Sequence, residues 1–363
     1  MLMSTLQIGI VGLPNVGKST LFNALTNNNI LAANYPFATI EPNTGIVPVP
    51  DERLEKLAEL YRSQKVVPAT VTFMDIAGLV AGASKGEGLG NQFLSHIRAC
   101  NAIVQVVRTF KDPNVVHVDN DIDPKKDIEV INTELVLADL QTVEKRLPKL
   151  EKEARANPKL KPLLDTLQRA HNLLNDNKPL SSVDDLDLEH LNDLHLLTAK
   201  PVIYLFNFDE AGLQDETRKN ELRQLAAPAC SLFVCAQLES ELNGLDKTDA
   251  AELLESYGQK ESGLVQLIHA AYDVLGLQSY LTAGEKEVRA WTIKKGATAP
   301  EAAGVIHGDF ERGFIAAEVV SYEDLIAAGS EAAAKAAGKL RTEGKTYVMR
   351  HNDVVEFRFN VSK

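Results

Sequence analysis

The amino-acid sequence predicts an α/β protein of two or three domains, and three observations support this fold class. An apolar run, QIGIVG (7–12), leads into the glycine-rich stretch GLPNVGKS (12–19) and a helical pattern, the order strand, phosphate-binding loop and helix. Further strand-like runs alternate with helical segments, at 67–78, 102–107, 201–209 and 231–237. The chain has 363 residues, enough for more than one hydrophobic core.

Strands and helices alternate through the first 130 residues. The first strand is expected to be buried, and the helix after the glycine-rich stretch is expected to begin near Lys18. A loop rich in Asn, Pro and Thr should extend from Asn27 to about Pro50. The expected elements that follow are a helix over 51–62, a strand over 67–78, a glycine-rich loop over 78–91, a helix over 93–100 and a buried strand over 102–107.

The pattern changes near Ile131, where leucine-rich helical stripes begin. Apolar residues at 140, 143, 147 and 150 are spaced by three or four with charges between them, which is typical of a coiled-coil seam. A second stripe over 160–174 follows the sequence ANPK. We therefore expect a helical hairpin inserted at 131–199, with a kink at Pro148. Strands then return at 201–209 and 231–237, before a helix over 263–277.

A small mixed domain is expected from Gln278 to the end, so that the nucleotide-binding domain comprises 1–130 and 200–277. TAPE (298–301) is a capping box that opens a helix, and Ser330 and Gly338 are expected to cap an alanine-rich helix. Strands are expected at EVRAWTIKKG (287–296), FIAAEVV (314–320), YVMRH (347–351) and VVEFRFNV (354–361).

Composition and charge exclude several classes of protein. The formal net charge is -12, which argues against a generally basic, nucleic-acid-coating surface and against a sequence-specific DNA-binding protein. The segment 278–363 is neutral, with 12 basic and 12 acidic residues, and is therefore the part least repelled by RNA. The three cysteines lack disulfide or zinc spacing, and no apolar run approaches a membrane span. We expect a cytoplasmic protein.

GLPNVGKS matches the phosphate-binding pattern G-x-x-x-x-G-K-[ST] in the required strand–helix context. Glycines allow consecutive backbone N–H groups to surround an anion, and the start of the helix adds its positive end. Lys18 is expected to contact the terminal phosphates, and the Ser19 hydroxyl to bind Mg²⁺. The predicted nucleotide-binding residues of this stretch are Asn15, Val16, Gly17, Lys18, Ser19 and Thr20.

Two further segments occur in the order found in GTPases. NYPFATIEPNTG (34–45) contains Thr39, which is expected to bind Mg²⁺ when a γ-phosphate is present; Thr44 is the alternative. DIAG (75–78) ends a strand, so Asp75 is expected to hold Mg²⁺ through water and the Gly78 N–H to contact the γ-phosphate. Both segments are expected to become ordered with the γ-phosphate bound.

The residue after Gly78 is Leu79, where the Ras-like arrangement has a glutamine that positions water. Leucine cannot orient water, so hydrolysis is expected to be slow, to use another group or to require a partner. His117 is the preferred candidate, and His96 is the alternative. The Asn15 amide oxygen is a candidate ligand for K⁺ beside the phosphates, although it could equally stabilise its own loop.

NFDE (207–210) stands where a GTPase reads Asn-Lys-x-Asp. Glu210 is one methylene longer than the aspartate that recognises guanine, so it favours ATP; a degraded GTP site is the alternative. Asn207 can pair with the adenine edge, and Phe208 is expected to cover the base or ribose. Asp209 lies one residue early and is expected to point away. Ala236 and Gln237 of CAQ (235–237) are expected to complete the base edge.

Taken together, GLPNVGKS, NYPFATIEPN, DIAGLVAGASKGEGLGN, NFDE and the terminal EGKTYVMRHNDVVEFRFNV resemble the YchF family of Obg-like ATPases over essentially the whole chain. The resemblance implies a Ras-like P-loop NTPase domain, an inserted antiparallel helical coiled coil and a C-terminal α+β TGS domain of β-grasp type. It also implies Mg²⁺, ATP preference, slow hydrolysis and association with ribosomes. Candidate RNA contacts in the terminal domain are Lys294, Lys295, Arg312, Arg350 and Arg358.

The favoured hypothesis is therefore an ATPase that acts as a molecular switch on ribosomes. The alternatives are a GTPase translation factor of the Obg type, a nucleotide-stabilised protein-binding scaffold and a metabolic P-loop kinase. The kinase would need an acceptor pocket and an arginine-rich lid, and neither is found in the sequence.

Overall fold

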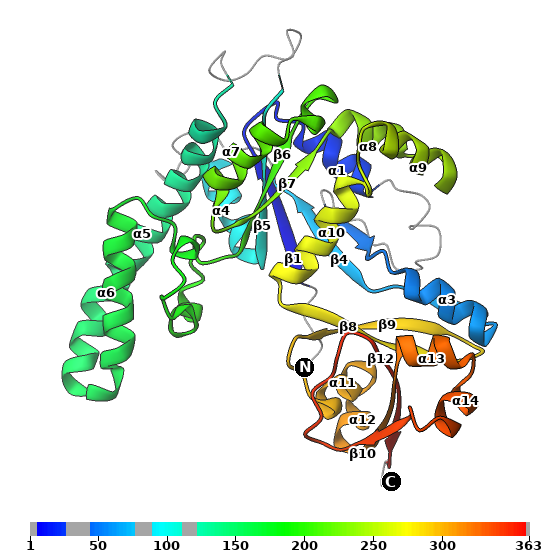
Figure 1. Cartoon of the computed structure of the whole chain (residues 1–363). Helices are drawn as coiled ribbons and strands as arrows, with labels where there is room; N and C mark the ends of the chain where they lie inside the picture. Colours follow the sequence, from blue (N-terminus) through cyan, green and yellow to red (C-terminus); the bar gives the residue numbers. More distant parts are fainter. Residues whose placement is uncertain (1–5, 27–43, 77–88, 111–121, 361–363) are drawn as a thin grey trace. The chain divides into compact units, whose positions relative to one another are not determined.

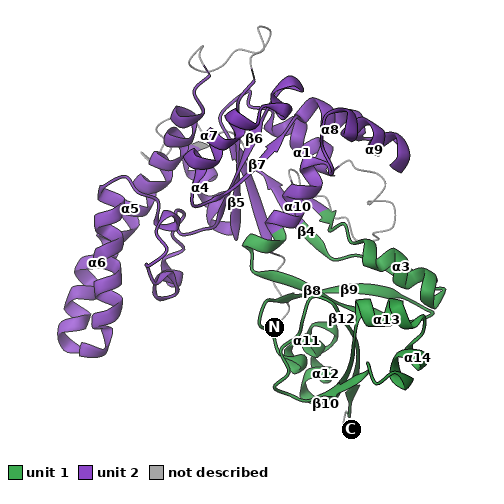
Figure 2. Cartoon of the chain, in the orientation of Figure 1, with its two compact units in different colours: residues 1–5, 47–71, 272–363 green, residues 6–46, 72–271 purple. Residues whose placement is uncertain are grey.

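Two six-stranded sheets organise the computed structural model, which describes residues 6–26, 44–76, 89–110 and 122–360. The chain divides into two compact units (Figure 2). Residues 6–46 and 72–271 form the N-terminal unit, and residues 1–5, 47–71 and 272–363 form the C-terminal unit. The segments around Thr39, Gly78, Leu79 and His117 lie outside the described residues.

The sheet of the N-terminal unit has the order β2-β4-β1-β5-β6-β7, and its pairs β4–β1, β1–β5, β5–β6 and β6–β7 are parallel. The central strands are mostly apolar, as expected for a sheet with helices on both faces. The strands are β1 (Gln7–Gly12), β2 (Thr44–Pro48), β4 (Thr70–Asp75), β5 (Ala102–Arg108), β6 (Val202–Asn207) and β7 (Cys230–Val234). Residues 44–48 were expected in a loop; they form an edge strand instead.

Helices surround this sheet (Figure 1); α1, α4 and α10 lie in segments where the sequence predicted helices, whereas α7, α8 and α9 were not predicted. In one layer, Leu222 and Ala226 of α7 pack with Tyr204 and Phe206 of β6 in a single hydrophobic cluster. The helices are α1 (Lys18–Thr26), α4 (Leu89–Ala99), α7 (Glu216–Ala226), α8 (Ala236–Leu242), α9 (Lys247–Ser256) and α10 (Gly263–Val274).

The predicted helical hairpin is confirmed as α5 (Pro124–Ala156) and α6 (Lys161–Asn175), which lie side by side (Figure 1). A short 3-10 turn, η2 (Pro158–Leu160), joins the helices, and the leucine stripes meet in one buried cluster. Helix α5 continues through Pro148. At its base, the buried Asp139 carboxylate accepts hydrogen bonds from Leu197 N, Thr198 N and Thr198 Oγ1 at 2.8, 2.8 and 2.7 Å. This contact ties α5 to the segment that leads into β6.

The C-terminal unit contains a mixed sheet in the order β11-β10-β12-β8-β9-β3. Its core includes Tyr280, whose hydroxyl donates to Ala302 O at 2.9 Å. The strands are β3 (Val66–Val67), β8 (Leu277–Ala283), β9 (Val288–Lys294), β10 (Phe314–Ser321), β11 (Arg341–Glu343) and β12 (Asp353–Phe359). The helices are α3 (Glu52–Tyr61), α11 (Ala299–Ile306), α12 (Gly308–Arg312), α13 (Tyr322–Ala328) and α14 (Glu331–Ala336).

Local capping in the C-terminal unit follows the sequence closely. The Thr298–Glu301 capping box is present at the start of α11, and the Ser330 hydroxyl accepts from Ala333 N at 3.1 Å at the start of α14. The C-cap of that helix is Ala337 and not Gly338 as expected; Gly338, at φ +70°, is the next residue. The strand expected at YVMRH is wrong: Val348 forms an isolated bridge with Thr298, in which Met349 N donates to Ala297 O and Ala299 N donates to Tyr347 O.

Candidate nucleotide-binding site

The carboxyl ends of neighbouring parallel strands bring the predicted site residues to one edge of the sheet. In the strand register, Ile10 lies opposite Asp75, and Asn207 lies opposite both Arg108 and Val234. Ligands of open α/β sheets bind at the carboxyl ends of the strands. The two halves of the predicted site, at residues 12–20 and 207–237, are therefore assembled by sheet topology.

The phosphate-binding loop has the backbone conformation that its sequence predicts. Asn15 and Gly17 have φ values of 62° and 92°, in the left-handed region that asparagine tolerates and glycine adopts freely. A Cβ at Gly17 would lie 2.3 Å from Asn207 Nδ2, so no larger residue fits there without movement. Helix α1 begins directly afterwards at Lys18 and spans nine residues. Its N-terminal N–H groups supply an anion-binding end.

Lys18 and Asp75 meet beside this loop. Lys18 is 9% exposed, and its ammonium contacts the Asp75 carboxylate at the end of β4. Ser19 and Thr20 are exposed on the first turn of α1. A hydroxyl and a carboxylate are the oxygen ligands that Mg²⁺ takes together with phosphate oxygens. Ser19 and Asp75 thus fit the predicted metal site, whose third predicted ligand, Thr39, lies outside the described residues.

Arg108 is a buried cation that the sequence analysis did not identify. Its side chain is 1% exposed at the end of β5, where Nε donates to Phe110 O at 3.1 Å and the guanidinium lies 4.4 Å from the Phe110 ring centroid. Its Nη1 is 3.5 Å from Asn15 O in the phosphate-binding loop. An arginine that closes the apolar run AIVQVV was the available sequence signal.

Asn207 connects the two halves of the site. Its Nδ2 donates to Val16 O at 2.9 Å, and its Oδ1 accepts from Ala236 N at 3.0 Å. The side chain is 2% exposed, so these bonds are made away from water. These two bonds use one N–H and one lone pair of the amide. Asn207 therefore holds the phosphate-binding loop and the start of α8 in fixed positions.

Phe208 and Asp209 have local structural roles. Phe208 is 5% exposed and packs edge-on against Phe233, at 5.9 Å between ring centroids, so at most an edge of its ring faces a nucleotide. The Asp209 Oδ1 accepts from Gly212 N at 2.8 Å and thereby closes the turn after β6. That bond gives Asp209 a structural partner within its own turn.

Glu210 has a partner that the sequence analysis did not identify. Tyr257, which follows α9, donates its hydroxyl to Glu210 Oε2 at 2.8 Å. This hydrogen bond to the Glu210 carboxylate raises the pKa of Tyr257. Gln237 is exposed, and its Nε2 donates to Glu241 Oε1 at 3.2 Å. The base end therefore combines residues from three separate segments.

The candidates for activating hydrolysis occupy different parts of the chain. His96 is exposed on α4, and its carbonyl accepts from Cys100 Sγ at 3.3 Å. Thr44, the alternative to Thr39, is the first residue of β2. His117, Gly78 and Leu79 lie outside the described residues. No helix in the described part of the chain is long and apolar enough to span a membrane.

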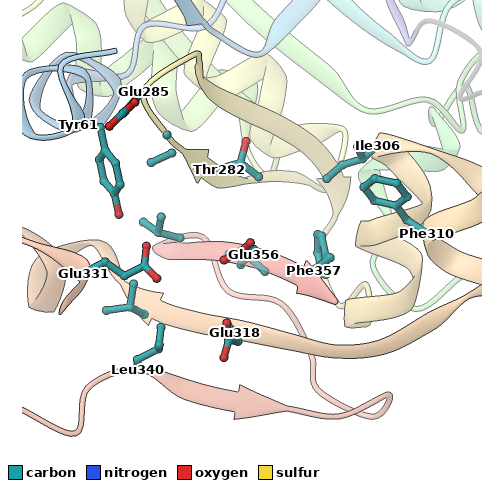
Figure 3. A pocket seen from close by; sticks show the side chains of 15 residues that line it. Tyr61, Thr282, Glu285, Ile306, Phe310, Glu318, Glu331, Leu340, Glu356 and Phe357 are labelled. Atoms are coloured by element: carbon teal, nitrogen blue, oxygen red, sulfur yellow. The ribbon is translucent and has the colours of Figure 1, made fainter. Parts of the chain in front are cut away.

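A separate pocket of about 530 Å³ lies within the C-terminal unit (Figure 3). Its lining includes Glu285, Glu318, Glu331 and Glu356, and none of the predicted nucleotide-binding residues. Burial and the Glu331 carboxylate raise the pKa of Tyr61, at the rim, to about 12. Carboxylates repel a triphosphate, so this pocket is not the nucleotide site.

A phosphate-binding loop between a parallel strand and a helix, with a lysine and a carboxylate beside it, defines a P-loop nucleotide-binding protein with a GTPase-like fold. A family model described as "50S ribosome-binding GTPase" matches residues 7–139. The model of the YchF GTPase C-terminal domain, described as a protein of unknown function, matches residues 277–360.

Curated relatives match along nearly the whole chain. The chain is 52% identical to the "Ribosome-binding ATPase YchF" of Bacillus subtilis, over 98% of this chain and 100% of that protein. It is 50% identical to the protein of the same name from Escherichia coli O157:H7, over 98% and 99%. The chain belongs to the YchF family.

Solved structures agree with this assignment. The Schizosaccharomyces pombe YchF GTPase has a TM-score of 0.86 at 41% identity, with 98% of each chain covered. A GTP-binding protein from Pyrococcus horikoshii shares the fold, with a TM-score of 0.60 at 20% identity, covering 98% of this chain and 100% of that one. The predicted fold class is confirmed: a P-loop GTPase-type domain, a helical hairpin insert and a YchF-type C-terminal domain.

Proposed function

We propose that this protein is an ATP-hydrolysing molecular switch that acts on ribosomes in the cytoplasm. The observation that carries the choice of ATP is Glu210, which stands in place of the guanine-reading aspartate and is held by Tyr257. The relatives named as ribosome-binding ATPases support the same assignment.

The phosphate end of the site supports binding and hydrolysis through charge neutralisation and positioning. Lys18 is already buried beside the loop, so its ammonium can exchange Asp75 for the terminal phosphates at little cost in reorganisation. When bound, Mg²⁺ would neutralise phosphate charge, and Ser19, Thr39 and Asp75 are the residues proposed to hold it. Gly78 is proposed to contact the γ-phosphate, and His117 to act on water in place of the glutamine replaced by Leu79.

The base end would be formed by Asn207, Glu210, Ala236 and Gln237, with an edge of Phe208. Guanine presents two donors to an aspartate at this position, whereas adenine presents an acceptor at N1 and a donor at its 6-amino group. The longer Glu210 side chain does not fit guanine held in the usual place. Asn207 keeps a donor and an acceptor for the adenine edge after binding Val16 and Ala236.

Ribosome binding is proposed to involve the helical hairpin insert, residues 131–199, and the C-terminal TGS domain, residues 278–363. Among the candidate RNA contacts, Lys295 pairs with Asp273, Arg312 with Asp309, and Arg358 with Glu318. Exposed pairs of this kind contribute about 0–1 kcal/mol each, so a phosphate can replace the acidic partner. We propose K⁺ at Asn15 as an accessory cation.

Titration of the full-length protein with Mg·ATP and with Mg·GTP, for wild type and Glu210→Asp, tests the choice of nucleotide. We expect wild type to hold ATP more tightly and Glu210→Asp to shift toward GTP, with Glu221→Asp on the exposed face of α7 as a matched control that shifts neither. A GTPase is the second candidate, because the Schizosaccharomyces pombe relative is named a GTPase. Wild type that binds GTP more tightly than ATP would establish that alternative.

The switch is tested by limited proteolysis in ADP and in a non-hydrolysable ATP analogue. We expect slower cleavage near residues 39 and 78 with the analogue, because the γ-phosphate is proposed to order both segments. Identical cleavage patterns in the two nucleotides would contradict a switch while leaving nucleotide binding intact. ATP hydrolysis rates measured in K⁺ and in Na⁺ test the proposed K⁺ site at Asn15. Equal rates in the two salts would contradict a role of Asn15 in binding K⁺.

A further inference from the structure

Tyr257 lies outside every nucleotide-binding motif in the sequence, yet its hydroxyl reaches the residue on which the choice of base depends. It follows α9 in the chain and lies 47 positions after Glu210, whose Oε2 accepts its hydrogen bond at 2.8 Å. The Tyr257 ring packs against the hydrophobic cluster that contains Phe208 and Cys235. The ring is thus anchored by the core of the N-terminal unit while the hydroxyl points to the site.

A glutamate at position 210 would weaken selection of adenine over guanine unless its carboxylate were restrained. A free carboxylate would repel the N1 acceptor of adenine, and it could turn to accept from the N1–H and 2-amino group of guanine. A hydrogen bond from a neutral hydroxyl to a carboxylate is short, directional and charge-assisted. Such a bond occupies one lone pair of Glu210 Oε2 and limits rotation of the side chain.

We propose that Tyr257 is a specificity-determining positioning residue, which holds the Glu210 carboxylate in an orientation that disfavours GTP and tolerates ATP. This inference rests on the proposed ATP-binding function and concerns the same site. The length of the Glu210 side chain and its restraint by Tyr257 would contribute separately to the choice between ATP and GTP. Loss of the restraint leaves the phosphate-binding residues unchanged.

A structural role for Tyr257 makes a different prediction from a role in selection. If the hydroxyl served only to stabilise the loop after α9, its loss would weaken ATP and GTP binding alike. If it restrains Glu210, its loss changes the ratio of the two affinities. The ratio of dissociation constants for GTP and ATP is therefore the informative quantity.

Tyr257→Phe removes the hydroxyl and retains the ring in its hydrophobic cluster. We expect the GTP-to-ATP ratio of dissociation constants to fall about three- to tenfold relative to wild type, the effect of losing one charge-assisted hydrogen bond. Tyr204→Phe is the matched control: Tyr204 belongs to the same cluster, and its hydroxyl accepts from Asn132 Nδ2 at 3.2 Å. That variant should leave the ratio unchanged.

The Glu210→Gln background tests whether Tyr257 acts through the carboxylate. Without a charge to restrain, Tyr257→Phe should change the ratio little in that background; an equal change in both backgrounds overturns the inference. A wild-type preference for ATP that Tyr257→Phe leaves unaltered also overturns it, and Tyr257→Leu repeats the test if the first variant is unstable. Absence of any ATP preference in wild type instead contradicts the proposed function, so the two failures are distinguishable.

Discussion

Replacement of Asn207 by alanine tests whether one buried amide joins the phosphate and base ends of the site. The variant removes the hydrogen bonds to Val16 O, at 2.9 Å, and from Ala236 N, at 3.0 Å. Both backbone groups would then be unpaired beside a position that is 2% exposed. A buried polar group without a partner costs about 1–3 kcal/mol, so for the two groups we expect a loss of roughly 2–6 kcal/mol in the N-terminal unit.

Asn207→Asp provides a nearly isosteric comparison. One carboxylate oxygen can still accept from Ala236 N, but the other takes the place of Nδ2 and faces Val16 O. A donor is thus replaced by an acceptor, and we expect a loss of stability at least equal to that of the alanine variant. If Asn207 contributed only through its size and packing, Asn207→Asp would have nearly the same stability as wild type.

Urea unfolding without nucleotide, followed by far-ultraviolet circular dichroism, measures these losses. Trp291, the single tryptophan, lies in β9 of the C-terminal unit, so its fluorescence provides an internal reference. We also expect ATP affinity to fall at least about tenfold in both variants, which corresponds to about 1.4 kcal/mol. Unchanged midpoints together with unchanged ATP affinity would refute the reasoning.

Three further predictions concern the buried Asp139 carboxylate and the cysteine thiols. Asp139→Ala leaves Leu197 N and Thr198 N without their acceptor, so we expect the free energy of unfolding in urea to fall by about 2–4 kcal/mol. Asp185→Ala is the control, because it removes only an exposed ion pair with Arg169 and should change the free energy of unfolding little. Burial raises the pKa of Cys100 to about 11 and also raises the pKa of Cys235, whereas Cys230 is partly exposed. A thiol-reactive disulfide reagent at pH 8 should therefore modify Cys230 alone, and a fast-reacting thiol that persists in Cys230→Ala would contradict this. Because the pKa of Cys100 is higher in the folded state than its ordinary value of 9.0, its contribution to stability is present below about pH 9 and is lost as the pH rises toward 11.

Local sequence determined the phosphate-binding half of the site. Its conformation depends on consecutive residues, with Asn15 and Gly17 in the left-handed region and Lys18 at the start of α1. Such features need no knowledge of distant segments, because sterics and helix capping act over a few residues. The same holds for the Thr298–Glu301 capping box.

The contacts that the sequence did not reveal are between distant segments. Arg108 approaches Asn15 across 93 positions, and Tyr257 reaches Glu210 across 47. Phe208 was expected to cover a base, but the core between β6 and β7 encloses most of its ring. A large apolar residue next to a strand end is compatible with either place, and only the packing around it decides.

The two ends of the nucleotide site therefore differ in how they can change. The loop at the phosphate end is a continuous stretch in which glycine and lysine are required by backbone conformation and charge. The base end is assembled from residues near 207, 236 and 257, so one side chain can alter purine choice while the triphosphate contacts persist. A GTPase-type fold can accordingly serve ATP with few substitutions. Asn207 limits this independence: its amide bonds both ends at once, so its removal should weaken triphosphate binding and base reading together.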